Sequence, residues 1–269
     1  MIVLHHAYNS VCSQKVRLAL FEKGIEWSGE ILDLSKGDQF RPAYMRMNPN
    51  AVVPTLVHDG RVVIESTVIN EYIDDAFDGP ALRPADPYGR ALMRLWTKQP
   101  DEGVHVTVNT LSFAIALRLP VLKMTSEQRE ARINGIPDPA RRDKMREMIE
   151  RGVDSPLVDA ALARFDKLFG DMDAQLAKTA WLAGETYSLA DIGLAAYVHR
   201  IDRLGLSPMW TERRPRLTGW LAQLRARPAH SKAFAEYELP EHLKLMADGG
   251  VEAWPAIEKK LLAARARVE

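Results

Sequence analysis

The sequence predicts an α/β N-terminal domain followed by an all-α helical bundle. Residues 1–78 alternate short strand and helix patterns in the order βαβαββα, which is typical of a small mixed sheet flanked by helices. Residues 79–87 are rich in proline and glycine, which interrupt helices. From residue 88 onward, apolar side chains recur every three or four residues, the spacing of amphipathic helices. We therefore predict domains 1–78 and 88–269, joined by a linker at 79–87.

The first domain divides into short elements bounded by turn residues. We expect strand 2–5, helix 10–23, a strand near 27–32, a short helix near 41–47, strands 55–57 and 62–64, and helix 66–77. Asp59-Gly60 predicts a tight hairpin turn between the last two strands. In the linker, Asp86 followed by Pro87 reads as a helix N-cap and first helical residue.

The second domain reads as helix almost throughout. Long helices are predicted from Leu92, Leu95 and Trp96, and from the apolar stripe within residues 158–176. The charged segment 125–154 reads as an insertion that ends in a solvated helix near 141–151, and it contains Gly135, Pro137 and Pro139. A further helical pattern predicts that the C-terminal tail packs on the body, through Trp254, Ile257, Leu261, Ala264 and Val268.

Composition excludes several classes of function. The chain has 36 basic and 36 acidic residues, so no overall field attracts nucleic acid or an anionic membrane. Cys12 is the only cysteine, which excludes an internal disulfide and a multi-thiolate metal site, and no histidine pattern has zinc-ligand spacing. No apolar run approaches the ~20 residues of a membrane span, and no leader pattern opens the chain. We expect a cytoplasmic protein without a metal.

The richest stretch for chemistry is the start of the first helix, where Ser10, Cys12 and Ser13 stand together. Unpaired backbone N–H groups and the positive end of the helix dipole favour an anion there, including a thiolate. The alternative is an ordinary capped helix with a buried cysteine.

Two further stretches have the chemistry of a peptide-binding site. Val53-Pro54 stands at the entrance to a strand, where a cis bond would expose edge groups of Val53 to an extended peptide; a trans, structural proline is the alternative. Glu65-Ser66 stands at the start of a helix, where Ser66 can cap and Glu65 can meet an ammonium group. The alternative there is a plain capped helix.

These motifs together resemble the cytosolic glutathione transferase family over essentially the whole chain. The run Ser10-Val-Cys12-Ser13 is similar to the zeta-class Ser-Ser-Cys motif. The resemblance implies a thioredoxin-like N-terminal domain, glutathione as co-substrate, a role in detoxification and a homodimer. By the same resemblance Ser10 is the residue that stabilises the thiolate and Cys12 is the motif cysteine. Glutathione would be bound by Ser13, Gln39, Val53, Pro54, Glu65 and Ser66.

Two branches of the family are similar to different parts of this chain. Residues 62–69, 82–87 and 93–98 resemble bacterial glutathione-dependent β-aryl etherases, whereas the Ser-Val-Cys-Ser run resembles reductive dehalogenases of chlorinated hydroquinones, with Cys12 at the catalytic cysteine. The tyrosine used by other classes has no clear counterpart, since Tyr8 precedes the motif. The segment from Gly184 to Asp191 resembles a structural signature of the helical domain, in which Ser188 and Asp191 form a capping box.

The resulting hypothesis is that Ser10 donates a hydrogen bond to the sulfur of glutathione, which then attacks a small hydrophobic or aromatic electrophile. A second hypothesis gives Cys12 a thiol-exchange step through a mixed disulfide. A third is a glutathione-binding scaffold without catalysis. The electrophile is expected between the domains, near Trp96, His105, Asn109 and Phe113.

Overall fold

The computed structural model describes residues 1–136 and 138–266, so Pro137 and Val268 lie outside the described residues. The chain forms two compact units, each assembled from several segments. Unit 1 comprises Met1–Glu102, Ala174–Val198 and Arg216–Leu239. Unit 2 comprises Gly103–Asp173, His199–Pro215 and Pro240–Glu269. The domain boundary at 79–87 stays a prediction.

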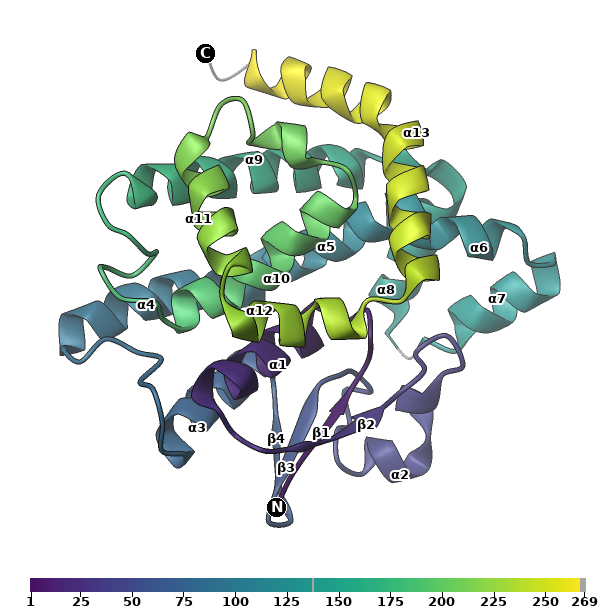
Figure 1. Cartoon of the computed structure of the whole chain (residues 1–269). Coiled ribbons are helices and arrows are strands. Elements are labelled where there is room, and N and C mark those ends of the chain that lie inside the picture. The colour runs from purple at the N-terminus through teal and green to yellow at the C-terminus, as the bar shows by residue number, and fades with distance from the viewer. Residues whose placement is uncertain (137, 267–269) are drawn as a thin grey trace. The chain divides into compact units, whose positions relative to one another are not determined.

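Unit 1 contains a four-stranded mixed sheet in the order β2-β1-β3-β4 (Figure 1). β1 (Ile2–His6) pairs in parallel with β2 (Ser28–Ile31) and antiparallel with β3 (Thr55–His58), which pairs antiparallel with β4 (Arg61–Ile64). The Asp59-Gly60 turn lies between β3 and β4, and both residues have positive φ, as a two-residue hairpin turn requires. The predicted α/β fold of this region is confirmed.

Helix α1 (Val11–Lys23) lies where helix 10–23 was expected and begins one residue later. Ser10 is its N-cap, and Gly24 ends it in the left-handed conformation at φ 74°. Its buried residues include Val16, Leu18 and Leu20, which lie in the core of unit 1. α3 (Ser66–Ala76) packs on α1, as the labelled helices in Figure 1 show.

The second predicted helix of unit 1 is shorter than expected. The helix expected near 41–47 is a 3₁₀ turn at Asp38–Phe40 followed by α2 (Pro42–Met45). The linker then leads into α4 (Pro87–Gln99), where Asp86 accepts from Gly89 N–H at 2.8 Å and Pro87 begins the helix, as predicted.

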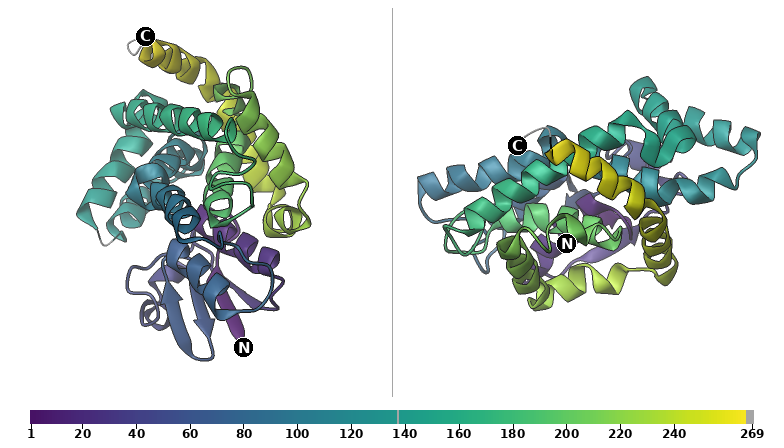
Figure 2. Two further views of the ribbon diagram at one scale, coloured as in Figure 1. Left: turned by 90° about the vertical axis from the view of Figure 1, so that its left-hand side faces the viewer. Right: turned by 90° about the horizontal axis from the view of Figure 1, so that it is seen from above.

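Beyond β4 the described residues form helices and turns, apart from an isolated bridge between Trp181 and Gly184 (Figure 2). The remaining α-helices are α5 (His105–Ser112), α6 (Arg118–Leu122), α7 (Ser126–Asn134), α8 (Pro139–Arg151), α9 (Pro156–Leu176), α10 (Leu189–Arg203), α11 (Pro215–Arg225), α12 (Pro228–Ala233) and α13 (Pro240–Arg265). Single π turns lie at Pro100–Val104 and Phe113–Leu117. The predicted helical class of this region is confirmed.

One helical run departs from the expectation about membrane spans. The helical run Pro87–Leu122 is long and apolar enough to cross a membrane, judged by length and composition only. The sequence was expected to contain no apolar run of that size. Of its most apolar window, 44% is buried inside the protein. Core helices have the same composition, so the run by itself is weak support for a membrane span.

The core of unit 2 is built on helix faces that the sequence identified. The apolar stripe of α9 is buried, including Phe165 and Phe169. In α13, Ile257 and Leu261 are buried, as predicted for the C-terminal tail. A methyl group added at Gly249 would lie 2.4 Å from Ile115 O, so α13 approaches another backbone there as closely as glycine allows.

The insertion 125–154 contains more helix than the sequence suggested. α8 covers the predicted solvated helix, and α7 precedes it with a capping box between Thr125 and Gln128. Ile133 and Ile149, from these two helices, are buried in one cluster with Val121.

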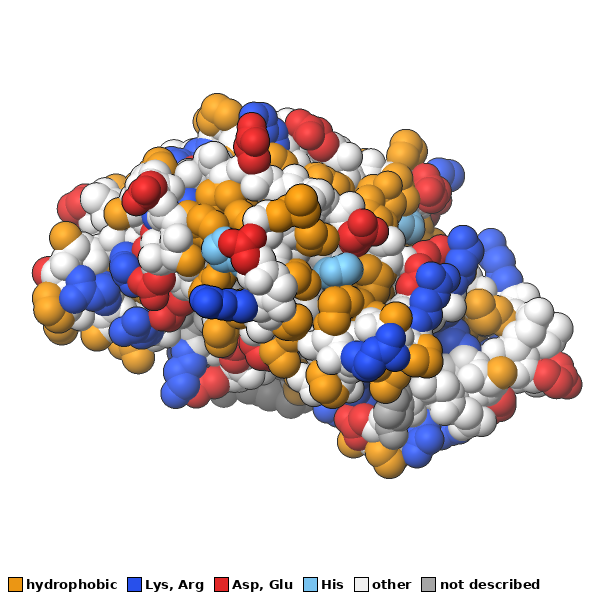
Figure 3. Space-filling view, turned by 90° about the horizontal axis from the view of Figure 1, so that it is seen from below, with side chains coloured by type: hydrophobic (Ala, Val, Ile, Leu, Met, Phe, Trp, Pro, Cys, Tyr) orange, Lys and Arg blue, Asp and Glu red, His pale blue; other side chains and the backbone are white. Residues whose placement is uncertain are grey.

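On the face shown in Figure 3, basic and acidic side chains are interspersed with apolar ones.

Candidate active site

The N-cap of α1 is the first part of the candidate site. Ser10 has extended backbone angles and its Oγ accepts from Ser13 N–H at 3.2 Å. A serine hydroxyl that accepts one hydrogen bond still has its own proton to donate. Ser10 is partly exposed, so the proton can reach a ligand. Ser10 therefore caps the helix, and its predicted contact with the sulfur of glutathione stays a prediction.

The loop before Ser10 is held in place by buried side chains. Ser13 Oγ accepts from Ala7 N–H at 3.3 Å, and Arg17 donates to Ala7 O and Tyr8 O. Burial lowers the pKa of Arg17 to about 10, which leaves it charged at neutral pH. Ser13 is fully buried, and its hydroxyl stabilises the loop through this hydrogen bond. Its predicted contact with glutathione is untested.

Cys12 lies one residue inside the helix and is partly exposed, which differs from the fully buried alternative. Its Sγ is 4.0 Å from the phenol oxygen of Tyr197 in α10. Burial raises the pKa of Tyr197 well above its usual value, so the phenol keeps its proton. Sequence reasoning missed Tyr197 because 185 positions separate it from Cys12.

The loop before β3 presents backbone groups to a ligand. The Val53–Pro54 peptide bond is cis, not trans, whereas the predicted contact of Val53 with a peptide stays a prediction. Tyr44 Oη and Asn48 Nδ2 both donate to Val52 O, at 2.6 and 3.0 Å. Within the described part of the chain, no hydrogen bond reaches the backbone N–H or C=O of Val53. These two groups are therefore available to an extended peptide.

The start of α3 differs from the prediction in one detail. Ser66 was expected to cap the helix, but Glu65 is the N-cap, without a side-chain capping bond, and Ser66 is the first helical residue. Glu65 has φ 69°, an uncommon conformation for a residue with a side chain, and its carboxylate accepts from Asn50 Nδ2 at 3.3 Å. The first N–H groups of α3 therefore have no capping side chain, which suits an anionic ligand.

Gln39 is the remaining predicted glutathione contact in unit 1. It lies in the 3₁₀ turn before α2, and its buried Oε1 has no hydrogen-bond partner among the described residues. A buried amide oxygen without a partner is costly unless a ligand or water donates to it. Gln39 therefore fits a polar ligand.

The predicted acceptor residues are distributed over both units. Trp96 lies on α4 in unit 1, whereas His105, Asn109 and Phe113 belong to unit 2. Asn109 Nδ2 and His105 Nε2 are 3.0 Å apart, and Phe113 packs against the cluster of Val121, Ile133 and Ile149. A shared acceptor pocket stays a prediction.

The Ser188 and Asp191 signature is structural, as expected. Asp191 accepts from Ser188 N–H at 3.0 Å, from Leu182 N–H at 3.1 Å and from Trp220 Nε1 at 2.9 Å. Burial raises the pKa of Asp191 to about 6. Among the residues that the structure describes, no group of three or more His, Cys, Asp or Glu could hold a metal ion.

Two family models match the chain on the segments that carry this geometry. The model described as "Glutathione S-transferase, N-terminal domain" matches residues 9–76, and "Glutathione S-transferase, C-terminal domain" matches residues 155–223. The chain belongs to the glutathione S-transferase family. The first match includes Ser10, Cys12, the cis-proline loop and the start of α3.

Curated relatives are similar to this chain over most of its length. "Protein LigF" from Sphingobium sp. strain SYK-6 is 36% identical over 86% of the chain and 92% of that protein. "Tetrachloro-P-hydroquinone reductive dehalogenase" from Sphingobium chlorophenolicum is 30% identical over 86% of the chain and 95% of that protein.

Solved structures extend the likeness to three dimensions. The crystal structure of "Beta-etherase LigF" from Sphingobium sp. strain SYK-6 has a TM-score of 0.79 at 35% identity, over 87% of this chain and 99% of that one. A theta-class glutathione S-transferase from Xanthomonas axonopodis pv. citri with glutathione bound has a TM-score of 0.64 at 25% identity, over 86% of this chain and 96% of that one.

Proposed function

We propose that the protein activates the thiol of glutathione at Ser10 and delivers the thiolate to a small aromatic electrophile. The observation that carries this proposal is the hydrogen bond from Ser13 N–H to Ser10 Oγ, which orients the hydroxyl and leaves its proton for the sulfur. The positive end of α1 favours the thiolate further.

Glutathione has the chemistry that the rest of the site would recognise. Its peptide backbone can pair with the free N–H and C=O of Val53 beside Pro54, and its carboxylate can accept from the first N–H groups of α3 at Ser66. Its ammonium group can meet the carboxylate of Glu65, while Gln39 Oε1 can accept from an N–H group. Pro54 shapes the loop, and glutathione is the co-substrate in this proposal.

A second candidate function places the chemistry on Cys12, because this partly exposed residue lies in the first turn of α1, two positions after Ser10. The Cys12 thiolate attacks the sulfur of an aryl glutathione conjugate, the carbon–sulfur bond breaks, and its electron pair takes a proton at carbon. The Cys12–glutathione disulfide that forms is then reduced by a second glutathione thiolate, which releases glutathione disulfide. This route uses Cys12 in a reductive dehalogenation, the activity named for one relative.

One substrate screen tests both functions. The protein is incubated with glutathione and, separately, a β-aryl ether, a chlorinated hydroquinone and 1-chloro-2,4-dinitrobenzene. Conjugates that form in wild type and are lost in Ser10→Ala support thiol activation. Reduced product together with a glutathione adduct on Cys12, seen by mass spectrometry, supports the exchange route. Retention on immobilised glutathione without turnover of any electrophile favours the scaffold and overturns both.

The acceptor site is also a proposal. We assign the electrophile to Trp96, His105, Asn109 and Phe113, on the residue types alone. Single alanine substitutions at these positions are expected to raise KM for the electrophile and leave the Kd for glutathione unchanged. An unchanged KM in all four variants would remove the assignment.

We further propose a cytoplasmic homodimer with a role in detoxification. Val62 on β4, Val68 on α3 and Leu95 on α4 are apolar and exposed in unit 1, which favours self-association. Light scattering on the purified protein is expected to give twice the mass of one chain. A monomer mass at micromolar concentration would contradict the homodimer.

A further inference from the structure

Lys15, on the buried face of α1, is a cation without an ionic partner. It is 1% exposed, and among the described residues no carboxylate lies within salt-bridge distance of its ammonium group. Its Nζ donates to Thr67 Oγ1 at 3.1 Å and lies 5.8 Å from the ring centre of Tyr197. A buried ammonium is costly unless charges nearby compensate for the lost water.

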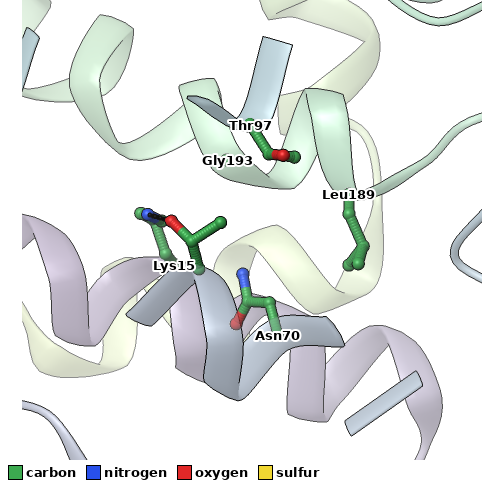
Figure 4. Close-up of a pocket in the computed structure, with 6 residues that line it drawn as sticks. Lys15, Asn70, Thr97, Leu189 and Gly193 are labelled. Carbon is green, nitrogen blue, oxygen red and sulfur yellow. Dashed lines mark hydrogen bonds between the residues drawn. The ribbon is translucent and has the colours of Figure 1, made fainter. Parts of the chain in front are cut away.

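The surroundings of Lys15 are polar and incompletely paired. Figure 4 shows Lys15 and Asn70 lining the same narrow gap, which is too tight to hold a water molecule. Asn70 is 3% exposed, and its Oδ1 has no hydrogen-bond partner among the described residues. The other lining residues are Thr67, Thr97, Leu189 and Gly193.

Lys15 is also one helical turn from Cys12, so both side chains occupy neighbouring positions on α1. Tyr197 connects them, because its phenol oxygen is 4.0 Å from Cys12 Sγ while its ring lies beside the ammonium group. Thr67 links Lys15 to the first turn of α3, and it donates to Asp101 at 3.2 Å. The ammonium group therefore lies between the two helix starts that form the candidate site.

The charged groups around Cys12 and Lys15 have opposing effects. Burial lowers the pKa of Lys15, while negative charge on Cys12, Asp101 and Glu65 raises it. The same interaction acts in reverse, because a positive Lys15 favours the thiolate form of Cys12. The titratable groups that face this cluster are Tyr197 from α10, Asp101 after α4 and Glu65 at the start of α3.

We propose that Lys15 is a positioning residue for the sulfur chemistry of this site: its buried ammonium group, held by Thr67 and beside Tyr197, supplies the positive charge that favours an anionic sulfur at Cys12. The inference rests on the proposed function of the α1 N-terminus. It adds a fixed charge from a side chain to the contribution of the helix dipole, and it explains why this buried lysine has no carboxylate.

The test follows the alkylation of Cys12 by iodoacetamide from pH 5 to 10, in the absence of glutathione. Replacing Lys15 by methionine removes the charge and keeps most of the volume. We expect the midpoint of the pH profile to move upward by about one unit in Lys15→Met. Lys15→Arg, which keeps the charge, should restore most of the wild-type profile. The exposed Lys98→Met is the matched control and should leave the midpoint unchanged.

Each outcome decides the proposal. A folded Lys15→Met protein with the wild-type midpoint overturns it, because a purely structural lysine would lower the melting temperature without moving the profile. If Lys15→Met does not fold, Lys15→Gln is used, and failure of both variants to fold also overturns it in favour of a structural role. The alkylation assay contains no glutathione, so it tests the role of Lys15 separately from the proposed function. If the midpoint moves as expected but the wild-type protein turns over no electrophile with glutathione, only the proposed function is overturned.

Discussion

A lysine is buried near each end of α1, and the two lysines have different partners. Near the C-terminal end, Lys23 donates to the Asp74 carboxylate at 2.8 Å and to the carbonyl oxygens of Asp74 and Pro80. Near the N-terminal end, Lys15 has a hydroxyl and an aromatic ring instead. Two similar side chains on one helix therefore have different electrostatic surroundings.

The comparison separates a structural charge from one available for chemistry. Asp74 also accepts from Leu82 N–H at 2.8 Å, so the Lys23 pair connects α1, α3 and the segment before α4. Its charge is neutralised within the fold. Lys15 has no such direct ion pair, and it lies on α1 near Cys12 and the helix starts where an anionic ligand is expected. A direct ion pair therefore stabilises the C-terminal end of α1, whereas the cation near the N-terminal end interacts with its acidic neighbours only at longer range.

The largest expected effect comes from removing the Lys23–Asp74 ion pair at the C-terminal end of α1. Asp74→Ala leaves the Lys23 ammonium buried and unpaired, which should lower the free energy of unfolding by about 3–5 kcal/mol. Urea denaturation measures this change. The double variant Lys23→Met with Asp74→Leu should recover much of the loss, since the buried ammonium is removed with its partner, while Arg83, which also pairs with Asp74, keeps Asp75. Equal loss in the single and double variants would contradict the role of the pair.

The next effect concerns the functional end. Ser10→Ala should lower kcat about 100-fold, because no hydroxyl remains to stabilise the sulfur, while the Kd for glutathione changes little. It should also cost about 1 kcal/mol of stability through the lost cap. Ser10→Gly is the matched control, since glycine caps nearly as well as serine and lacks the hydroxyl. If Ser10→Gly keeps its turnover, the hydroxyl is not the activating group.

A third effect is a pH dependence at His6, the last residue of β1, whose ring contacts Arg17 of α1. Burial, together with the positive charges of Arg17 and His5, lowers the pKa of His6 to about 3. Because unfolded histidine titrates near 6.5, the unfolded chain binds the extra proton between these values. Lowering the pH from 6.5 to 5 should therefore cost at most about 2 kcal/mol of stability.

Urea denaturation at pH 5 and pH 6.5 measures this dependence. His6→Asn keeps an acceptor near the Arg17 guanidinium, which lies 3.1 Å from His6 Nδ1, and removes the titrating group. The variant should lose most of the pH dependence, whereas His242→Asn in α13 should keep it. An unchanged dependence in His6→Asn would show that other groups cause it.

The smallest effect concerns affinity. Glu65→Gln keeps the side-chain volume and removes the charge proposed to meet the ammonium group of glutathione. We expect Kd for glutathione to rise about 10-fold by calorimetry, with kcat nearly unchanged. Glu71→Gln is the control, because this carboxylate on the same helix pairs with Arg94 at the surface. Equal changes in the two variants would point to general electrostatics.

Sequence patterns were sufficient wherever neighbouring residues determine structure. The bounds of α1 follow from Ser10 and Gly24, and the hairpin follows from Asp59-Gly60, because caps and tight turns depend on local backbone geometry. The capping box of Thr125 and Gln128 could have been read in the same way.

The rest of the site depends on contacts between distant segments. Tyr197 is 185 positions from Cys12, and Tyr44 fixes the loop before Pro54 from inside the core, so neither has a local signal. The wrong assignment of Ser66 as a cap has a backbone cause. Glu65 adopts a positive φ and occupies the cap position itself. The residue preferences for helix caps do not predict this conformation for a glutamate.

The close approach at Gly249 and Gly250 limits how the C-terminal helix can change in length. A Cβ at Gly250 would lie 2.2 Å from Leu204 O, just as one at Gly249 would meet Ile115 O. Because each residue turns a helix by about 100°, inserting or deleting one residue upstream in α13 would rotate this glycine pair away and bring a bulkier side chain to the same backbone. Length variation should therefore be tolerated only beyond this pair, toward the end of the chain.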